Sequence, residues 1–298
     1  MRNQKVIVIN GFQRGGTNIL YNIFQSHPLI CSPNNLETGE IISQNYRLYS
    51  YPKTKLIRYL IKRGKLNLYR LLNQKAILNS ILTRIIGYLI DGIFFRYKRK
   101  NYRNPFNRFK YENVPYSKKE VKNSMLCLKS VHHDIELNHF FSKIYPNIFF
   151  IGLIRNGYAL CESWIRRGKD TEYCSLRYRK FCEMMIKDSK KLKNYKIVKF
   201  EDVLENPFEM ASKLYKFTKL KPIFLEKLRL QVKRILTEEG HRIKYGKESA
   251  KYWFDPKNIT HLLDPNINKI QIQKLSERDR KIFEKNTLSI LKYFSYLH

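Results

Sequence analysis

A glycine-rich turn near the start of the chain carries residue types that bind a phosphate. The segment VIVINGFQRGGTN places Gly11, Gly16 and Thr17 at the spacing of a nucleotide loop. Where such a turn joins a strand to a helix, the N–H groups of residues 15–18 point at an anion. The ATP- and GTP-binding loop G-x-x-x-x-G-K-[ST] also needs a lysine for the β- and γ-phosphates. That lysine is missing and the positive charge is Arg14, so the turn predicts a phosphate site without γ-phosphate or magnesium chemistry.

A second anion site follows the apolar segment IFFIGLI. A nucleotide hydrolase needs an aspartate at the end of such a strand to bind magnesium, but this segment is followed by Arg155. An arginine at the carboxyl end of a strand is a bidentate clamp for an anion. Two anion sites without a metal ligand indicate a nucleotide whose phosphates lie at two separate positions.

The remaining polar residues show no metal-binding pattern. The five cysteines form no CxxC or CxxH pair, so we expect reduced, mostly buried thiols. His132, His133 and His139 lack partners at ligand spacing, and no metal is expected. For His132 and His133 we favour a helix-capping or surface role over contact with an acceptor.

Five short apolar runs alternate with helical stretches along the chain. They predict strands at residues 6–10, 29–32, 125–129, 148–154 and 195–200. This alternation predicts an α/β fold of three layers, P-loop-like, with a central parallel sheet flanked by helices. Asn206 and Pro207 predict a helix start, and residues 276–296 a closing helix.

The 298 residues suit one domain, 1–298, with a basic helical insertion at about 41–124. Within the insertion, AILNSILTRIIGYLIDGIFF is apolar but interrupted by Arg84 and Asp91, which argues against a membrane-spanning helix. Two alternatives remain. A helical hairpin covering the active site is favoured over docking of the insertion on a membrane surface.

The chain is strongly basic, with 58 Lys and Arg against 25 Asp and Glu and a formal charge of +33. Such a charge attracts nucleic acid, anionic lipid headgroups or an acidic substrate. A chain-wide bias toward Lys, Asn, Ile and Tyr explains the charge equally well, so charge alone identifies no partner. The first strand begins by Val6, which leaves no room for a signal peptide, and a cytoplasmic location is expected.

Taken in order, these segments resemble the sulfotransferases that use 3′-phosphoadenosine 5′-phosphosulfate (PAPS). The family's 5′-phosphosulfate loop reads roughly [KR]-[ST]-G-T-[TS], and it is matched by Arg14, Gly15, Gly16, Thr17 and Asn18. Gly15 and Asn18 depart from the pattern, because a hydroxyl is more usual at both positions. Asn18 still offers an amide to a phosphate oxygen.

The family's 3′-phosphate motif is an arginine at a strand end followed by a serine on the next helix. RNGYALCES supplies Arg155 and Ser163, and Arg167, one turn further, is expected on the same helix face. Residues 199–217 resemble the strand and helix that follow in this family. The segment after His241 lies where the family often covers the nucleotide, and it stays unassigned.

The resemblance also implies catalytic roles. Arg14 would stabilise the charge on the departing 3′,5′-bisphosphate (PAP), and Glu37, with Glu40 as second choice, would be the general base. Lys129 resembles the lysine of the family's K-[TDN]-P stretch and would share the charge on the sulfuryl oxygens, although Val131 replaces the proline.

The expected activity is metal-independent transfer of sulfate from PAPS to a hydroxyl or amine of a saccharide or lipid-linked glycan. A peripheral membrane contact is an open option for location, and no specific nucleic acid is expected. Two rivals remain: a metal-dependent kinase on a degenerate P-loop, and a non-enzymatic basic protein that binds nucleic acid.

Overall fold

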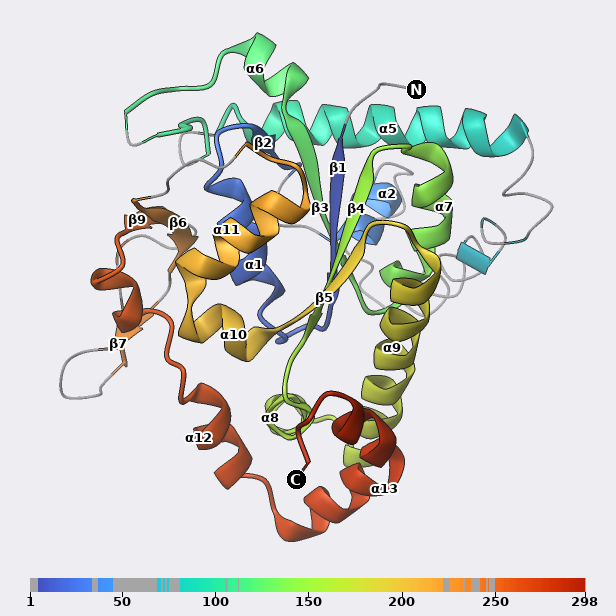
Figure 1. The fold of residues 1–298 in the computed structure, drawn as a ribbon, viewed down its shortest axis with the longest axis vertical. Helices are drawn as coiled ribbons and strands as arrows, with labels where there is room; N and C mark the ends of the chain where they lie inside the picture. The colour runs from blue at the N-terminus through green and yellow to red at the C-terminus, as the bar shows by residue number, and fades with distance from the viewer. Residues whose placement is uncertain are drawn as a thin grey trace.

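A five-stranded parallel sheet forms the centre of the computed structural model (Figure 1). The structure describes residues 5–33, 37–44, 69–70, 72, 74, 81–104, 107–111, 113–221, 226–232, 234–236, 242–244, 246 and 250–297. The strands are β1 (Val6–Gly11), β2 (Ile30–Cys31), β3 (Met125–Val131), β4 (Ile148–Ile154) and β5 (Tyr195–Lys199), in the order β2-β3-β1-β4-β5. The predicted α/β fold and its strands are confirmed. β5 ends one residue early because Phe200 begins a helix.

The register of β1 brings the predicted anion sites to one edge of the sheet. Gly11 lies opposite Val131 of β3, and Asn10 lies opposite Gly152 of β4. Because the strands are parallel, the glycine-rich turn and the ends of β3 and β4 all open at this carboxyl edge. Every residue of β1, β3 and β4 is buried, as expected of strands covered on both faces.

One face of the sheet is covered by α1 (Thr17–Gln25), α10 (Phe200–Glu205) and α11 (Pro207–Phe217). Ile7 and Ile9 of β1 point into this core. Two small antiparallel pairs flank it, β6 (Leu228–Gln231) with β9 (Lys251–Phe254) and β7 (Arg234–Leu236) with β8 (Arg242–Lys244). The helix start at Pro207 is confirmed, but the Asn206 side chain makes no capping hydrogen bond.

The opposite face is covered by helices that include the insertion. They are α2 (Thr38–Gln44), α5 (Ile81–Asn101), α6 (Lys118–Asn123), the 3-10 helix η1 (His132–Leu137) and α7 (Asn138–Ile144). Val6 and Val8, which alternate with Ile7 and Ile9, point into this second core. None of the described helices is long and apolar enough to cross a membrane.

Helix α5 does not cover the carboxyl edge. Its buried residues Ile90 and Phe94 pack on the sheet face, and Lys98 Nζ donates to the Ser124 carbonyl, 2.7 Å away, just before β3 begins. Figure 1 shows α5 lying across the amino-terminal ends of the strands. The predicted hairpin over the active site is therefore wrong for this helix, because its apolar stripe is used by the core at the other edge.

A third group of helices packs at the carboxyl edge. It comprises α8 (Gly157–Ile165), α9 (Thr171–Lys191), α12 (Ile267–Gln273) and α13 (Glu277–Tyr293), whereas the 3-10 helix η2 (Asn258–His261) packs in the first core through Ile259. The predicted closing helix is confirmed, and Ser276 caps it by accepting from the Asp279 N–H at 3.1 Å. All five cysteines are buried and free, as expected.

Candidate active site

The glycine-rich turn delivers the amino end of α1 to the carboxyl edge. Arg14 and Gly16 both adopt left-handed backbone, with φ of 69° and 86°. The Gly15 N–H is used inside the turn, where it donates to the Phe12 carbonyl at 3.0 Å. The sequence predicts that the N–H groups of residues 15–18 face an anion. Because the Gly15 N–H is used, the N–H groups of residues 16–18 at the start of α1 are left for this role. A Cβ at Gly16 would overlap the Phe200 ring, so this position needs glycine.

Three arginines meet beside this turn. The pKa of Arg14 is lowered mainly by burial, and the positive charges of Arg167 and Arg166 lower it further. Helix α8 ends at Ile165, so Arg167 approaches Arg14 from the following turn and not from the helix face that it was expected to share with Ser163. Guanidinium groups gathered in this way suit a ligand with several negative charges.

Arg155 is 5% exposed and is held by three acceptors of the protein. Its Nη1 donates to the Arg14 carbonyl at 2.6 Å, Nε donates to Asn268 Oδ1 at 2.9 Å, and Nη2 donates to Gln271 Oε1. Burial lowers its pKa to about 10, against the attraction of Glu201. Arg155 thus ties the glycine-rich turn to α12, a tie that the sequence did not reveal.

Ser163 lies on α8, eight positions after Arg155, and is 1% exposed. Its Oγ has no hydrogen-bond partner among the residues that the structure describes. A buried hydroxyl left in this way costs free energy unless a ligand or water satisfies it. The Ser163 hydroxyl is therefore suited to a hydrogen bond with a bound ligand.

Glu37 precedes α2, and the start of that helix is tied to the carboxyl edge. Thr38 Oγ1 donates to the Lys129 carbonyl at 2.9 Å, and the Gly39 N–H donates to Asp134 Oδ2 at 2.8 Å. The Glu37 N–H donates to Glu40 Oε2 at 2.9 Å, so Glu40, the second-choice base, serves as a helix-capping acceptor.

The surroundings of Glu37 raise its pKa to about 7. Burial is the largest cause, and the neighbouring carboxylates Asp134 and Glu40 add to it. Lys129 and a hydrogen bond from Gln13 Nε2 to Glu37 Oε1, at 3.4 Å, act in the opposite direction. A carboxylate with this pKa is well matched to general-base work near neutral pH.

Lys129 connects this carboxylate with α1. Its side chain is buried, and Nζ donates to Asn18 Oδ1 at 2.8 Å. Burial lowers the pKa of Lys129, while Glu37, Glu40 and Asp134 raise it. The Lys129 side chain thus lies between the start of α1 and the candidate base Glu37.

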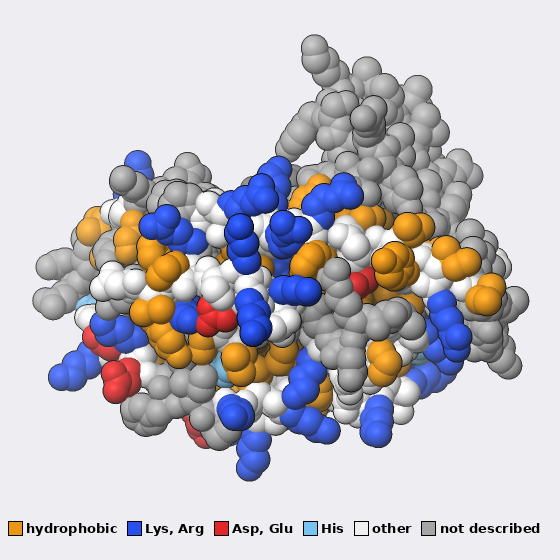
Figure 2. All heavy atoms as spheres, turned by 90° about the horizontal axis from the view of Figure 1, so that it is seen from above, with side chains coloured by type: hydrophobic (Ala, Val, Ile, Leu, Met, Phe, Trp, Pro, Cys, Tyr) orange, Lys and Arg blue, Asp and Glu red, His pale blue; other side chains and the backbone are white. Residues whose placement is uncertain are grey.

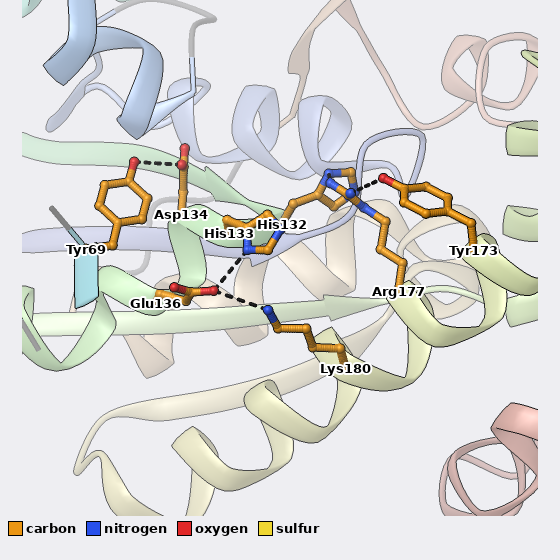
Figure 3. A network of polar contacts seen from close by, with 8 residues as sticks. All are labelled: Tyr69, His132, His133, Asp134, Glu136, Tyr173, Arg177 and Lys180. Carbon is orange, nitrogen blue, oxygen red and sulfur yellow. Dashed lines mark hydrogen bonds and ion pairs between the residues drawn. The ribbon is translucent and has the colours of Figure 1, made fainter. Parts of the chain in front are cut away.

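Residues of η1 and α9 form a polar network, shown in Figure 3, that contacts the glycine-rich turn through His132. The His132 backbone is left-handed, with φ of 56°, and its ring stacks on Phe181 at a centroid distance of 5.4 Å. His132 Nε2 accepts from the Gln13 N–H at 3.1 Å, and Nδ1 contacts Arg177, which also donates to Tyr173. The preferred capping or surface role is therefore wrong for His132.

The other members of this network pair with one another and with the start of α2. His133 pairs with Glu136 at 2.9 Å, and Lys180 lies 3.4 Å from the same carboxylate. Asp134 accepts from Tyr69 as well as from the amide of α2 (Figure 3). The sequence did not indicate that Gln13 and Arg177 belong to the site. The position of Gln13 in the glycine-rich turn is its only sequence signal, and Arg177 has no such signal.

Among the residues that the structure describes, no three His, Cys, Asp or Glu side chains are arranged so that they could hold a metal ion. The groups that the protein offers at this site are backbone amides, cationic side chains and Glu37, the carboxylate of raised pKa. This donor set suits an anionic group-transfer substrate.

Comparison with known proteins gives one family and one fold. The model of the sulfotransferase family matches residues 6–223. The sulfotransferase domain of the Synechococcus PCC 7002 olefin synthase is 15% identical with a TM-score of 0.51, over 94% of both chains. The sulfotransferase domain from the curacin biosynthetic pathway is 16% identical with a TM-score of 0.51, over 96% of this chain and 98% of that one. A search of curated proteins finds no match.

Proposed function

Because the chain belongs to the sulfotransferase family, and is therefore a sulfuryl-transferring enzyme, we propose that its donor is PAPS and that PAP is the product. The acceptor is a hydroxyl or amine of a saccharide or lipid-linked glycan. One observation carries the proposal: a carboxylate with a pKa of about 7, Glu37, lies beside Lys129 and a cationic helix start.

The donor side consists of the turn and the start of α8. The amides of residues 16–18, the Thr17 hydroxyl and Arg14 would hold the 5′-phosphate, and Asn18 would add its side-chain amide. Ser163, Arg167 and Arg155 would hold the 3′-phosphate, for which Arg155 must release some of its present acceptors. The unsatisfied Ser163 Oγ and the arginine cluster support this fit. PAPS, when bound, supplies the sulfuryl group.

The chemical roles follow from charge and position. Sulfuryl transfer resembles phosphoryl transfer in passing through a loose state, so positioning and charge stabilisation supply most of the rate. Glu37 takes the proton of the acceptor hydroxyl. Arg14 stabilises negative charge on the leaving phosphate, and Lys129 stabilises charge on the transferred oxygens. Glycine suits position 15 because a Cβ there would lie only 3.0 Å from the Phe12 carbonyl oxygen, which accepts from the Gly15 N–H.

The acceptor side lies next to Glu37 and the cations of α9. The charge of Glu37 is felt by Arg177, so both side chains face the same region. A cationic surround favours an anionic acceptor, which supports a saccharide that carries negative charge. We further propose one domain over 1–298 with the 41–124 insertion, action in the cytoplasm without a metal, and no specific nucleic-acid partner.

The kinase alternative is not favoured. The turn has no lysine after Gly16, and β4 is followed by Arg155 where a magnesium-binding aspartate is needed. The non-enzymatic alternative is excluded by membership of an enzyme family.

Calorimetric titration with PAP, compared with ATP and magnesium, tests the donor. We expect metal-independent PAP binding that Arg14→Ala weakens by roughly tenfold or more, because a charge-assisted contact is lost. Arg179→Ala is the matched control, since Arg179 pairs with Glu183 on α9. Binding of ATP with magnesium alone, or equal PAP affinity in both variants, would overturn the proposed donor site.

A further inference from the structure

The edge of the sheet opposite the candidate site carries an unusual set of exposed side chains. We name it the amino-edge face, formed by α5, α6, residues 107–111 and 113–117, and the amino ends of the strands. Seven large hydrophobic side chains are exposed on it: Leu29, Ile81, Ile85, Tyr88, Leu89, Tyr111 and Val114, at 45–76% exposure. Apolar side chains that gather on one face mark an interaction surface.

The solvent side of α5 divides into an apolar and a basic half. Ile81, Ile85, Tyr88 and Leu89 recur at helical spacing along its first half, and Arg96, Arg99 and Lys100 continue the same side toward its end. The single acid of this helix, Asp91, is turned inward, 6% exposed, and accepts from Tyr145 OH at 3.2 Å. The outward side of α5 therefore carries no negative charge.

Two basic grooves lie on the same face. One, of about 470 Å³, runs along the end of α5 and is lined by Gly92, Phe95, Arg96, Arg99, Lys100 and Arg103. The other, of about 760 Å³, is lined by five lysines, Lys5, Lys110, Lys119, Lys219 and Lys221, among other residues. Its one acid, Glu120, is paired with Lys110. Figure 2 shows Lys and Arg gathered in the middle of this face and hydrophobic side chains beside them.

We propose that the amino-edge face docks on an anionic membrane surface. The apolar half of α5 enters the boundary between headgroups and acyl chains, and the basic grooves bind lipid phosphates. Nucleic acid is disfavoured as the occupant, because it would use the cations and leave four aliphatic and aromatic side chains of α5 in water. This inference does not depend on the sulfuryl-transfer chemistry.

Docking at this face has a consequence for the acceptor. The candidate site opens at the carboxyl ends of the strands, at the far end of the sheet from α5 (Figure 1). The site therefore faces away from the lipid. A lipid-linked glycan would be modified on sugars far from its lipid, and a water-soluble saccharide would reach the site freely.

The experiment is sedimentation of the protein with phosphatidylcholine vesicles, with and without phosphatidylserine. Wild type is expected to bind only the anionic vesicles, less at high salt. Arg99→Gln/Lys100→Gln should weaken binding about fivefold per charge, and Ile85→Ser/Leu89→Ser about tenfold or more. Lys285→Gln/Leu288→Ser on α13, whose two side chains are likewise exposed, is the matched control and should bind as wild type does.

Hydrogen exchange on the wild type gives a readout that needs no variant, and should show added protection in α5 and α6 with anionic vesicles. Absence of vesicle binding, or equal loss in the α13 control, would overturn the proposal. Tighter binding to duplex RNA that ignores Ile85→Ser/Leu89→Ser would assign the face to nucleic acid. If sedimentation analysis shows a dimer that Ile85→Ser/Leu89→Ser dissociates, the amino-edge face is instead an interface with a second copy of the chain.

Discussion

Replacement of the candidate base, Glu37→Gln, should lower activity and raise stability, each with its own pH dependence. The pKa of Glu37 moves from an ordinary 4.5 to about 7, so the folded protein disfavours its ionised form. At about 1.36 kcal/mol per pH unit the full shift corresponds to roughly 3.4 kcal/mol, and screening by nearby solvent reduces this to about 1–2 kcal/mol.

The direction of the stability change with pH follows from the difference between the pKa of Glu37 in the folded and in the unfolded protein. Below pH 4.5 Glu37 is protonated in both the folded and the unfolded protein and has no effect on the free energy of unfolding. As pH rises from about 4.5 to about 7 the unfolded chain is ionised while the folded protein still holds the proton, so the wild type loses stability that Glu37→Gln retains. The variant should melt roughly 2–6 °C higher than wild type at pH 8 and at the same temperature at pH 4.

Two assays check this prediction. Thermal unfolding at both pH values measures the stability gain, and Glu136→Gln is a control of opposite sign, because pairing with His133 and Lys180 outweighs burial and lowers the pKa of Glu136. In turnover, kcat/KM of the wild type should rise with pH through about 7, and Glu37→Gln should be slower by about two to four decades. A variant that melts lower than wild type at pH 8 would refute the stability argument. Normal turnover would show that Glu37 is not the general base and would leave Glu40 or a histidine for that role.

Three further substitutions separate the other roles. Ser163→Ala should leave the melting temperature unchanged or slightly higher, because the hydroxyl that it removes is buried without a partner among the described residues, yet weaken PAP binding by roughly tenfold in calorimetry. Arg155→Ala should weaken PAP binding by roughly 2–5 kcal/mol and also lower the melting temperature, because buried acceptors on Asn268 and Gln271 are left behind; an unchanged melting temperature would contradict this. Gly16→Ala should cost roughly 3 kcal/mol or more in denaturant unfolding, given the left-handed backbone and the Phe200 ring; a fully stable variant would place the turn elsewhere.

Much of the site's order along the chain could be predicted from local pattern. The alternation of Val6 and Val8 with Ile7 and Ile9 serves two cores, and the run is apolar because the strand is buried on both faces. The turn could be recognised because only glycine tolerates the backbone at Gly16. These signals depend on a residue and its near neighbours.

Contacts between distant segments gave no such signal. Local pattern predicts a capping or surface role for His132, since nothing near it in sequence shows that it accepts from Gln13, 119 positions away. The apolar stripe of α5 predicts that this helix is buried, but it does not indicate the edge of the sheet at which burial occurs.

The sequence by itself determined the parallel sheet, the glycine-rich turn and the family resemblance, because periodicity, glycine geometry and motif spacing are local properties. Only the tertiary structure decided that Glu37 lies among Asp134, Glu40 and Lys129, and that Arg155 is tied to α12. A pKa and a hydrogen-bond partner depend on groups brought together from separate elements, and the distances between those groups are set by packing of the whole chain.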